Sequence, residues 1–266
     1  MILEEAMKVC MVQFQPSWLD PRKNFTALMN RSSELPDDCD LIIFPEMCTS
    51  GFAMNPEIFT PEIQDEADAV FSHLACETAS AVIAGTVEST GGHFFNSAVF
   101  LDAEGKQRGI YRKIHPFSFV HEQEYFSPGP AGGEIFGHKH MRITPGICYD
   151  LRFPEMFRVS ARQTNLIVII ANWPTSRIGH WKTLITARAV ENQCFVAAVN
   201  RLGSDGNGVE YPGESMIAAP DGRTVRLNGN PLEDEVLSAE IDLGEVETIR
   251  QKFQFLPDMR HRIELT

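Results

Sequence analysis

Short apolar runs recur along the chain and alternate with longer stretches of helical spacing, and no other feature limits the possible folds as much. The clearest run is NLIVIIANWP (165–174), in which apolar residues fill successive positions rather than alternate ones. Because neighbouring side chains of a strand point to opposite faces, such a strand must be covered on both faces. Buried strands separated by helices predict a layered α/β architecture.

The same pattern predicts the individual elements of the fold. Strands are predicted at residues 7–16, 40–46, 81–88, 141–150, 165–174, 194–201 and 235–243. Helices are predicted at residues 21–35, 65–79, 152–163, 180–193 and 245–253. Hairpins are predicted at residues 97–114 and 214–227, with turns near Glu104-Gly105 and at Asp221-Gly222. Since no Pro-, Gly- or Ser-rich linker divides the chain, residues 1–266 are expected to form a single domain.

The composition is that of a globular protein with a sizeable core, with 43% apolar and 22% charged residues. A net charge of −13 argues against nucleic acid and anionic membrane surfaces as partners. No stretch approaches the roughly 18 apolar residues of a membrane span, and the acidic N-terminus has no signal-peptide core. We therefore expect a cytoplasmic protein with free thiols.

No motif for a metal or a cofactor stands out in the sequence. The six cysteines are scattered without a CxxC pair, and HEQE (121–124) is not the HExxH motif of zinc enzymes. The segment GSDGNG (203–208) lacks the Lys-Ser/Thr of a phosphate-binding loop and is interpreted as a long turn after a strand. We therefore expect neither a metal nor a cofactor.

Glu46, Lys113 and Cys148 each follow a predicted strand. Ligands of open α/β sheets bind beyond the carboxyl ends of strands, and a cysteine at a strand-to-helix turn can have a lowered pKa. A thiol, a carboxylate and an ammonium group together suit amide hydrolysis through a thioester. The carboxylate would take the thiol proton and return it to the leaving amine. The lysine and the backbone N–H after the nucleophile would hold the oxyanion.

Each of these residues also has an ordinary structural interpretation. A cysteine after an apolar strand is commonly a small buried hydrophobic residue. A glutamate after a proline is commonly a solvated turn residue, and a lysine at a strand end is commonly exposed. The positions of the three residues therefore leave both interpretations open.

Three stretches in one order resemble the motifs of the nitrilase, or carbon–nitrogen hydrolase, superfamily: FPEM around Glu46, YRKIHPF around Lys113 and GICYDLRFPE around Cys148. The resemblance extends over nearly the whole chain. It implies a four-layer α-β-β-α sandwich, with Glu46 as general base and acid, Lys113 as oxyanion stabiliser and Cys148 as nucleophile. It also implies a homodimer formed through helices beside the site and through C-terminal segments that cross over.

The resemblance implies a fourth catalytic residue, a glutamate in the loop between the lysine and a glycine. The segment HEQEYFSPG contains two candidates, Glu122 and Glu124. Glu122 matches the family spacing to Lys113 and Gly129 better and is expected to orient Lys113 and the substrate. Both glutamates could instead be acidic residues of a surface loop.

Further stretches resemble the bacterial omega-amidase branch, namely PEMCTSGFAM (45–54), ANWPTSRIGHW (171–181), LITARAVENQ (184–193) and NRLGSDGNG (200–208). They imply hydrolysis of the terminal amide of 2-oxo acids, such as 2-oxoglutaramate or 2-oxosuccinamate, with release of ammonia. One alternative is an amidase of the same superfamily that acts on N-carbamoyl compounds, other aliphatic amides or nitriles. The other is a non-catalytic scaffold.

The carboxylate of a 2-oxo acid needs a cationic partner, and Arg152 is the first candidate. Arg152 could instead pair with Asp150 or Glu155 and brace the helix that follows, and the sequence does not decide between these roles. Arg177 and His180 are further candidates for the carboxylate. The other predicted substrate-binding residues are Tyr149, Phe117, Asn172 and Trp173, with Phe52 as an additional apolar wall.

Overall fold

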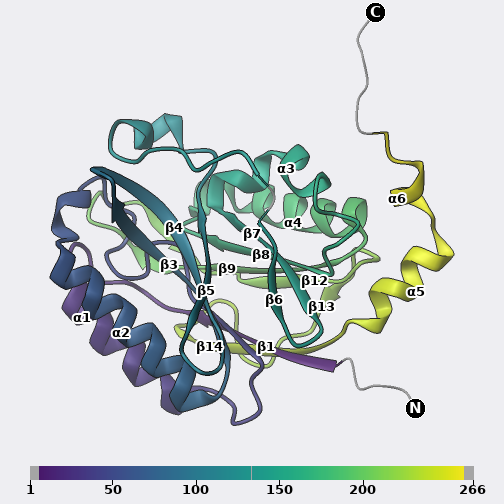
Figure 1. Cartoon of the computed structure of the whole chain (residues 1–266), viewed down its shortest axis with the longest axis horizontal. Helices are drawn as coiled ribbons and strands as arrows, with labels where there is room; N and C mark the ends of the chain where they lie inside the picture. The colour runs from purple at the N-terminus through teal and green to yellow at the C-terminus, as the bar shows by residue number, and fades with distance from the viewer. Residues whose placement is uncertain (1–5, 133, 261–266) are drawn as a thin grey trace, which may run out of the picture.

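Two β-sheets pack face to face in the computed structural model, which describes residues 6–132 and 134–260 (Figure 1). Helices cover the outer face of each sheet, so that the layers follow the order helix, sheet, sheet, helix. This arrangement confirms the predicted α/β fold, a four-layer α-β-β-α sandwich.

The first sheet has the strand order β14-β1-β2-β3-β4-β5. Its strands are β1 (Ala6–Gln13), β2 (Leu41–Ile43), β3 (Ala81–Thr90), β4 (His93–Leu101), β5 (Gln107–Arg112) and β14 (Glu235–Asp242). Helices α1 (Pro21–Asn30) and α2 (Pro61–Thr78) lie on its outer face. Since β1, β2 and β3 run parallel, their carboxyl ends point to the same edge of the sheet.

The second sheet has the strand order β13-β12-β9-β8-β7-β6. Its strands are β6 (Phe136–His138), β7 (Met141–Ile147), β8 (Leu166–Ala171), β9 (Phe195–Asn200), β12 (Met216–Ala218) and β13 (Thr224–Val225). Helices α3 (Pro154–Arg158) and α4 (Ile178–Asn192) cover its outer face. The central strands β7, β8 and β9 are parallel, so their carboxyl ends also share one edge.

Several shorter elements complete the fold. A separate two-stranded ribbon consists of β10 (Leu202–Ser204) and β11 (Glu210–Pro212). Helices α5 (Gly244–Lys252) and α6 (Phe255–Asp258) extend away from the sandwich (Figure 1). The 3₁₀ turns are η1 (Arg31–Glu34), η2 (Pro56–Ile58), η3 (Ser118–Val120), η4 (Glu122–Glu124), η5 (Cys148–Arg152) and η6 (Thr175–Arg177).

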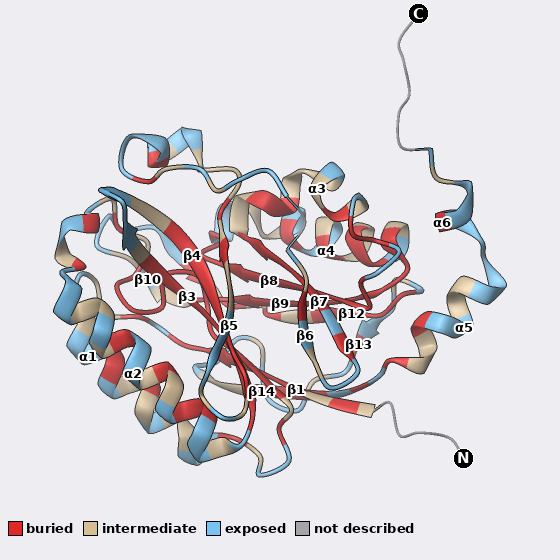
Figure 2. Ribbon diagram, viewed as in Figure 1, coloured by how far each residue is buried: buried red, intermediate tan, exposed pale blue. Residues whose placement is uncertain are grey.

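Strand β8, the fully apolar run of the sequence, shows how the layers are held together. Leu166, Val168 and Ile170 point into the core between the two sheets. Ile167 and Ile169 point to the other face and pack in the core under α4. Figure 2 shows the same burial along the central strands of both sheets. Both faces of β8 are therefore covered, as the absence of alternating polar residues predicts.

The predicted helix at residues 152–163 is wrong in its length. The α-helical part, α3, ends at Arg158, and turns follow it. The hydroxyl of Thr144 on β7 lies 2.8 Å from the hydroxyl of Ser160 and 2.5 Å from that of Thr164. These side-chain hydrogen bonds tie the segment to the sheet in a non-helical path, which serine and threonine favour over the helix interior.

Both predicted hairpin turns are confirmed. Gly105 lies between β4 and β5 with φ 73°, and Gly222 lies between β12 and β13 with φ 89°. A positive φ of this size is accessible to glycine without a steric cost from Cβ. The segment at residues 203–208 forms the end of β10 and the turn that leads to β11, as its composition predicts.

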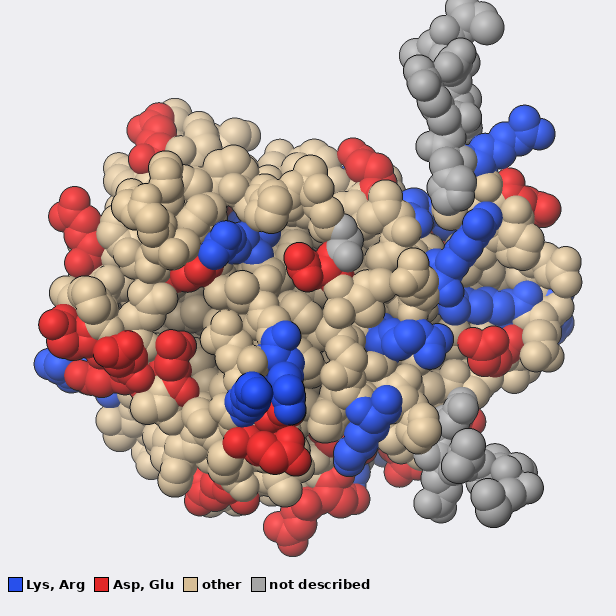
Figure 3. Space-filling view, in the orientation of Figure 1, with Lys and Arg blue, Asp and Glu red and all other residues tan. Residues whose placement is uncertain are grey.

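Charged residues of both signs are distributed over the surface. On the face in Figure 3, acidic side chains gather on the side of α1 and α2, and basic side chains lie mainly over the centre and toward α5. Acidic side chains also lie next to the basic ones at the centre and toward α5, so the basic side chains form no extended stripe on this face. In the part of the chain that the structure describes, no helix combines the length and apolar character of a membrane span.

Leu166 tests the core between the sheets, because its side chain is fully buried. Leu166→Ala is expected to lower the free energy of unfolding by about 2–5 kcal/mol, through lost burial and the cavity that it leaves. The matched control is Leu232→Ala at a position that is 57% exposed, with an expected change within about 0.5 kcal/mol. Urea unfolding of both variants gives the comparison. Equal losses would contradict the assigned core.

Candidate active site

Chain segments that follow strands of both sheets meet at one edge of the sandwich. In the first sheet, Glu46 comes after β2 and Lys113 comes directly after β5. In the second sheet, Cys148 comes directly after β7 and Asn172 directly after β8. Hydrogen bonds join Glu46 to Lys113 and to Asn172. The site therefore lies at the seam between the sheets and draws its side chains from both.

The ammonium group of Lys113 lies between two carboxylates in a region shielded from solvent. Its Nζ is 2.9 Å from Glu46 Oε1 and 2.8 Å from Glu122 Oε2. The exposed fraction of the side chain is 1% for Lys113 and 0% for both glutamates. Of the two candidate loop glutamates, Glu122 thus contacts the lysine, whereas Glu124 is exposed and lies 3.1 Å from His121 Nδ1.

These contacts decide the charges of the cluster. Burial opposes the charge of Lys113, but Glu122 and Glu46 outweigh it and raise the pKa of the lysine well above its ordinary value. Burial also opposes the charge of Glu46, but Lys113 and the amides of Asn172 and Asn96 hold the pKa of this carboxyl below its ordinary value. Glu46 is therefore ionised at neutral pH and able to accept a proton.

Two asparagines hold the glutamates in place. Asn96 Nδ2 on β4 donates to Glu46 Oε1 and to Glu122 Oε1, both at 2.8 Å. The backbone N–H of Asn172 donates to Glu46 Oε2 at 2.9 Å, and its Nδ2 donates to the same oxygen at 3.0 Å. Asn172 was predicted to bind substrate, whereas Asn96 was not predicted at all. Its signal in the sequence is an amide inside the apolar strand HFFNSAVF, at a position that is 1% exposed.

Gly85 on β3 makes the position of Glu46 possible. A Cβ atom at this residue would lie 2.4 Å from Pro45 O and 2.5 Å from Glu46 Cα. Cβ atoms essentially never make non-bonded contacts this short, so any side chain at position 85 would displace the backbone that carries Glu46. The close approach of β3 is thus part of the positioning of the carboxylate.

Cys148 occupies a strained turn between β7 and η5. Its φ is 45°, in the left-handed region that residues other than glycine rarely adopt. Such a conformation costs on the order of 1–3 kcal/mol and is commonly found where function requires it. The turn places Sγ 3.7 Å from the carbonyl oxygen of Asn172, to which a neutral thiol donates its hydrogen.

The lowered pKa that a strand-to-helix turn can give a cysteine is not found at Cys148. Burial raises the pKa of the thiol well above its ordinary value, the charges of Glu46 and Glu122 raise it further, and Lys113 opposes them. The helix that was expected to favour a thiolate is a 3₁₀ turn followed by the five residues of α3. A dipole that short does not offset two nearby carboxylates. The resting group is therefore a neutral thiol.

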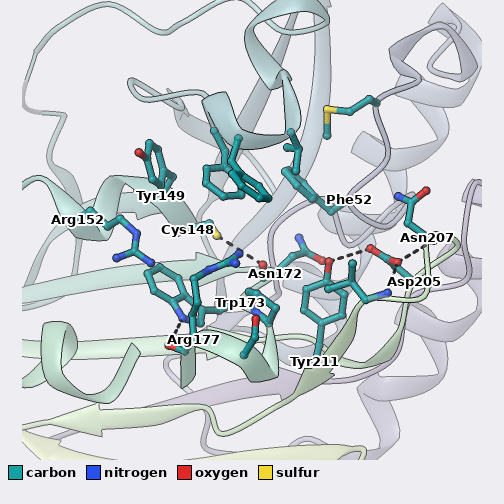
Figure 4. Close-up of a pocket in the computed structure, with 17 residues that line it drawn as sticks. Phe52, Cys148, Tyr149, Arg152, Asn172, Trp173, Arg177, Asp205, Asn207 and Tyr211 are labelled. Carbon is teal, nitrogen blue, oxygen red and sulfur yellow. Dashed lines mark hydrogen bonds between the residues drawn. The ribbon is translucent and has the colours of Figure 1, made fainter. Parts of the chain in front are cut away.

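Cys148 forms part of the wall of a cavity of about 380 Å³ (Figure 4). The five predicted substrate-binding residues also line it, namely Phe117, Tyr149, Arg152, Asn172 and Trp173. Glu46, Lys113 and Glu122 are buried and do not belong to the residues that line the cavity. Among the residues that the structure describes, no cluster of His, Cys, Asp or Glu has an arrangement that could hold a metal ion.

Two arginines face the cavity at one end (Figure 4). The guanidinium carbon of Arg152 lies 4.7 Å from the ring centroid of Trp173, and that of Arg177 lies 5.5 Å from the centroid of Phe117. Within residues 6–132 and 134–260, no carboxylate oxygen lies within 4.0 Å of either guanidinium. Burial and, next, the charge of Arg177 lower the pKa of Arg152.

The alternative role of Arg152, an ion pair with Asp150 or Glu155, is not formed among the described residues. Asp150 is buried and accepts hydrogen bonds from other groups, including Tyr111 Oη at 2.7 Å. The nearest polar partner of Arg152 is His180 Nδ1, at 3.4 Å from Nη1. Arg152 is therefore free to meet a ligand in the cavity.

The opposite wall of the cavity comes from the turn at residues 203–208 and from β11. It presents Asp205, Asn207 and Tyr211 (Figure 4). Tyr211 Oη donates to Asp205 Oδ2 at 2.9 Å, and burial together with this carboxylate raises the pKa of the phenol. Sequence reasoning missed these residues. The short strand β10 and this turn come after β9, whose carboxyl end lies at the same edge as those of β7 and β8, and that order was the available signal.

The fold and this site define a hydrolase of carbon–nitrogen bonds, and comparison with known families gives the same class. The chain belongs to the carbon-nitrogen hydrolase family, whose model matches residues 8–251. The resemblance of the three sequence motifs to this superfamily is thereby confirmed.

Individual relatives narrow the comparison. The chain is 34% identical over 254 residues to 2-oxoglutaramate amidase of Bacillus subtilis, with 94% of this chain and 96% of the relative covered. It is 33% identical to omega-amidase YafV of Escherichia coli K12, with 93% and 94% covered. A carbon-nitrogen hydrolase superfamily protein from Xanthomonas campestris, solved with an arsenic adduct in its active site, has a TM-score of 0.87 at 29% identity, covering 97% of this chain and 99% of that chain.

The charge coupling at Cys148 predicts the effect of Glu46→Gln. This change removes an anion that raises the pKa of the thiol, so the pKa should fall. The pH at the midpoint of alkylation of Cys148 by iodoacetamide, followed by mass spectrometry, should move to a lower value. Glu124→Gln removes an exposed carboxylate and should leave the midpoint unchanged. A midpoint that stays in place or rises in Glu46→Gln would contradict the coupling.

Proposed function

We propose that the protein is an omega-amidase, which hydrolyses the terminal amide of a 2-oxo acid such as 2-oxoglutaramate and releases ammonia. The observation that carries this proposal is the pair Arg152 and Arg177, which face the cavity of Cys148 and have no acidic partner in the described chain. A substrate with an amide at one end and a carboxylate at the other fits such a cavity. The names of the relatives from Bacillus subtilis and Escherichia coli support the same substrate class.

In this proposal Cys148 is the nucleophile and Glu46 the general base. Transfer of the thiol proton to Glu46 leaves the net charge of the buried cluster unchanged. Loss of the proton to water would instead make that net charge more negative by one unit. The transfer therefore accompanies attack of Sγ on the amide carbon, since the free thiolate is disfavoured. The negative charge then moves to the carbonyl oxygen.

The oxyanion of this tetrahedral intermediate would be held by Lys113 and by the backbone N–H of Tyr149, which follows the nucleophile. Glu122 orients Lys113 through its contacts at 2.8 and 3.1 Å. Protonated Glu46 gives its proton to the leaving nitrogen, and ammonia departs from the acyl-enzyme. Water then attacks the thioester carbon while Glu46 takes one of its protons. The C–S bond breaks as this second intermediate collapses, and Glu46 returns that proton to sulfur, which restores the neutral thiol. The newly formed carboxyl group gives its remaining proton to the released ammonia, and the product leaves as a 2-oxo dicarboxylate.

The acyl part of the substrate would lie between Cys148 and the arginine pair. Trp173 and Phe117 form apolar walls and also stack against the guanidinium groups of Arg152 and Arg177. Aromatic faces fix the arginines without neutralising them, so the charges remain free for the substrate carboxylate. Tyr149 closes the same wall, with its ring centroid 4.8 Å from that of Phe117.

A panel of amides tests the proposal directly. The wild type should release ammonia from 2-oxoglutaramate faster than from an amide of equal length without a carboxylate, and Cys148→Ala should release none. Good turnover elsewhere without activity on any 2-oxo acid amide would sink the omega-amidase assignment. Carbon dioxide release from an N-carbamoyl compound would favour the other amidases. An inert wild type whose thiols resist alkylation would indicate a scaffold.

The arginine pair predicts a selective effect on binding. Arg152→Gln and Arg177→Gln should each raise KM for 2-oxoglutaramate by about 10- to 100-fold, the equivalent of a charge-assisted hydrogen bond of about 1.5–3 kcal/mol. KM for the amide without a carboxylate should stay within about twofold. Arg223→Gln, at the exposed hairpin turn, is the control and should change neither value. Equal losses on both substrates would contradict carboxylate binding by this pair.

The lowered pKa of Glu46 predicts the acid side of the pH profile. As the pH falls through this pKa, Glu46 gains a proton and can no longer act as the base, so kcat/KM falls. The midpoint should therefore lie below the ordinary glutamate value of about 4.3. Activity recovered after return to neutral pH separates this titration from acid unfolding. An acid limb centred above pH 6 would show that Glu46 is not held as a carboxylate.

We also propose that the protein is a homodimer. The terminal helices α5 and α6 extend away from the sandwich (Figure 1), and Phe253 and Phe255 there are 42% and 49% exposed. A second copy that packs against these helices would cover both rings. Light scattering on the purified protein measures the mass, and a monomer at micromolar concentration would rule the dimer out.

A cytoplasmic location is the remaining part of the proposal. All six cysteines are free thiols, and four of them, Cys10, Cys39, Cys48 and Cys194, are buried. A chain with this many unpaired cysteines suits a reducing compartment. Fractionation of the producing cell, with the protein traced by antibody, tests the location.

A further inference from the structure

The loop that carries Lys113 and the turn that carries Cys148 come from different sheets, yet one buried carboxylate binds both. Asp150 is 0% exposed and lies two residues after Cys148. Its Oδ1 accepts from the backbone N–H of His115 at 3.1 Å and from His115 Nδ1 at 2.8 Å. Its Oδ2 accepts from Tyr111 Oη at 2.7 Å and from the backbone N–H of Ile147 at 3.0 Å.

The four donor groups belong to residues that are close in sequence to Lys113 or to Cys148. Tyr111 and His115 flank Lys113 at the end of β5 in the first sheet. Ile147 directly precedes Cys148 at the end of β7 in the second sheet. In the described chain, the hydrogen bonds between residues 111–117 and residues 146–152 all end on Asp150.

We propose that Asp150 is a positioning residue that sets the distance and orientation between the Cys148 thiol and the Lys113 ammonium. This inference rests on the proposed function, because it takes Cys148 as nucleophile and Lys113 as oxyanion stabiliser. The bond to Ile147 N–H holds the entry into the strained turn at Cys148. The bonds to Tyr111 and His115 hold the segment on both sides of Lys113.

The chemistry of the group supports this role over simple filling of the core. A buried carboxylate only accepts hydrogen bonds, and without partners its burial is costly. Since both oxygens are occupied by donors from two sheets, a shift of either segment would leave an oxygen unpaired. Beside these bonds, Tyr111 and Ile147 both belong to the apolar core between the sheets, whose contacts are non-directional and tolerate sliding.

The hydrogen bonds of Asp150 to Tyr111, His115 and Ile147 are called the Asp150 linkage below. The imidazole of His115 extends this linkage to the cavity wall. Because the carboxylate cannot donate, Nδ1 of His115 is the donor in their contact, which leaves the hydrogen off Nε2 in the neutral ring. The ring stacks on Phe153 with a centroid distance of 3.8 Å, and Phe153 packs edge-on against Tyr149 at 5.2 Å. Tyr149 lines the cavity, so the linkage reaches both the nucleophile and the substrate.

The first test is Asp150→Asn, which keeps the shape of the side chain but turns one acceptor into a donor. We expect kcat on 2-oxoglutaramate to fall by at least about tenfold, with KM within about threefold of the wild type. A displacement of about 1 Å between reacting groups suffices for such a loss. Alkylation of Cys148 by iodoacetamide should also slow at least fivefold relative to exposed Cys76 in the same molecule, because the thiol moves away from the positive charge of Lys113.

Tyr111→Phe and His115→Gln make the test independent of whether Asp150→Asn folds. Each removes or alters one donor to Asp150, and each should lower kcat and slow alkylation of Cys148 in the same direction. If Tyr111 and His115 both act through Asp150, the variant that combines Tyr111→Phe with His115→Gln should lose no more kcat than about the larger of the two single losses. Additive losses in the double variant would overturn the shared linkage.

Thr144→Val is the matched control for a purely structural role. Thr144 lies on the same strand as Ile147 and makes buried hydroxyl contacts to Ser160 and Thr164, away from Lys113. This variant should lose thermal stability while kcat and the alkylation of Cys148 relative to Cys76 stay within about twofold. The proposal is overturned if Thr144→Val loses kcat and thiol reactivity as the Asp150 linkage variants do, or if those variants retain both.

The two proposals fail in different ways. If the wild type does not hydrolyse 2-oxo acid amides, the omega-amidase assignment fails. The positioning role is then still decided by the alkylation rates of Cys148 relative to Cys76, which need no substrate. Normal relative rates in all three linkage variants would overturn the positioning role even in an active omega-amidase.

Discussion

The ammonium of Lys113, enclosed by the carboxylates of Glu46 and Glu122, sets the conditions for the rest of the site. The three side chains are shielded from solvent, so each charge depends on its partners rather than on water. Removing one partner of a buried ion pair commonly costs about 3–5 kcal/mol, because the remaining charge is uncompensated. The amides of Asn96 and Asn172 complete the hydrogen bonds of the carboxylates and keep the cluster in one arrangement.

The excess of negative charge in this cluster explains the state of the nucleophile. Two carboxylates and one ammonium leave no compensation for a thiolate, and the raised pKa of Cys148 follows from this and from burial. Proton transfer within the cluster avoids that cost, because the charge only moves from oxygen to sulfur. The opposite condition holds in the cavity, where Arg152 and Arg177 offer positive charge to a ligand. A neutral amide near the thiol and a carboxylate at the arginines match these two environments.

The two-sheet sandwich allows the negatively charged buried cluster and the positively charged end of the cavity to exist in one site. Apolar side chains hold the sheets together, and the buried cluster occupies the seam where strands from both sheets end. Asp150 and Asn172 cross that seam with hydrogen bonds, so polar contacts fix what apolar packing alone would leave free to slide. The close approach of Gly85 to the backbone of Glu46 adds a steric limit to the same geometry.

The amino-acid sequence by itself determined a layered α/β architecture, most strands and both hairpin turns, because apolar periodicity and turn residues act locally. Three motifs in a fixed order determined the family, and the order of the four layers followed from that resemblance. It also placed Glu46, Lys113 and Cys148 after strands. Only the tertiary structure decided that Glu122 rather than Glu124 contacts Lys113, that Asn96 joins the cluster and that Arg152 faces the cavity. It also showed that the surroundings raise the pKa of the Cys148 thiol rather than lower it. These properties depend on distances between residues far apart in the chain and on shielding from water, which no local pattern encodes.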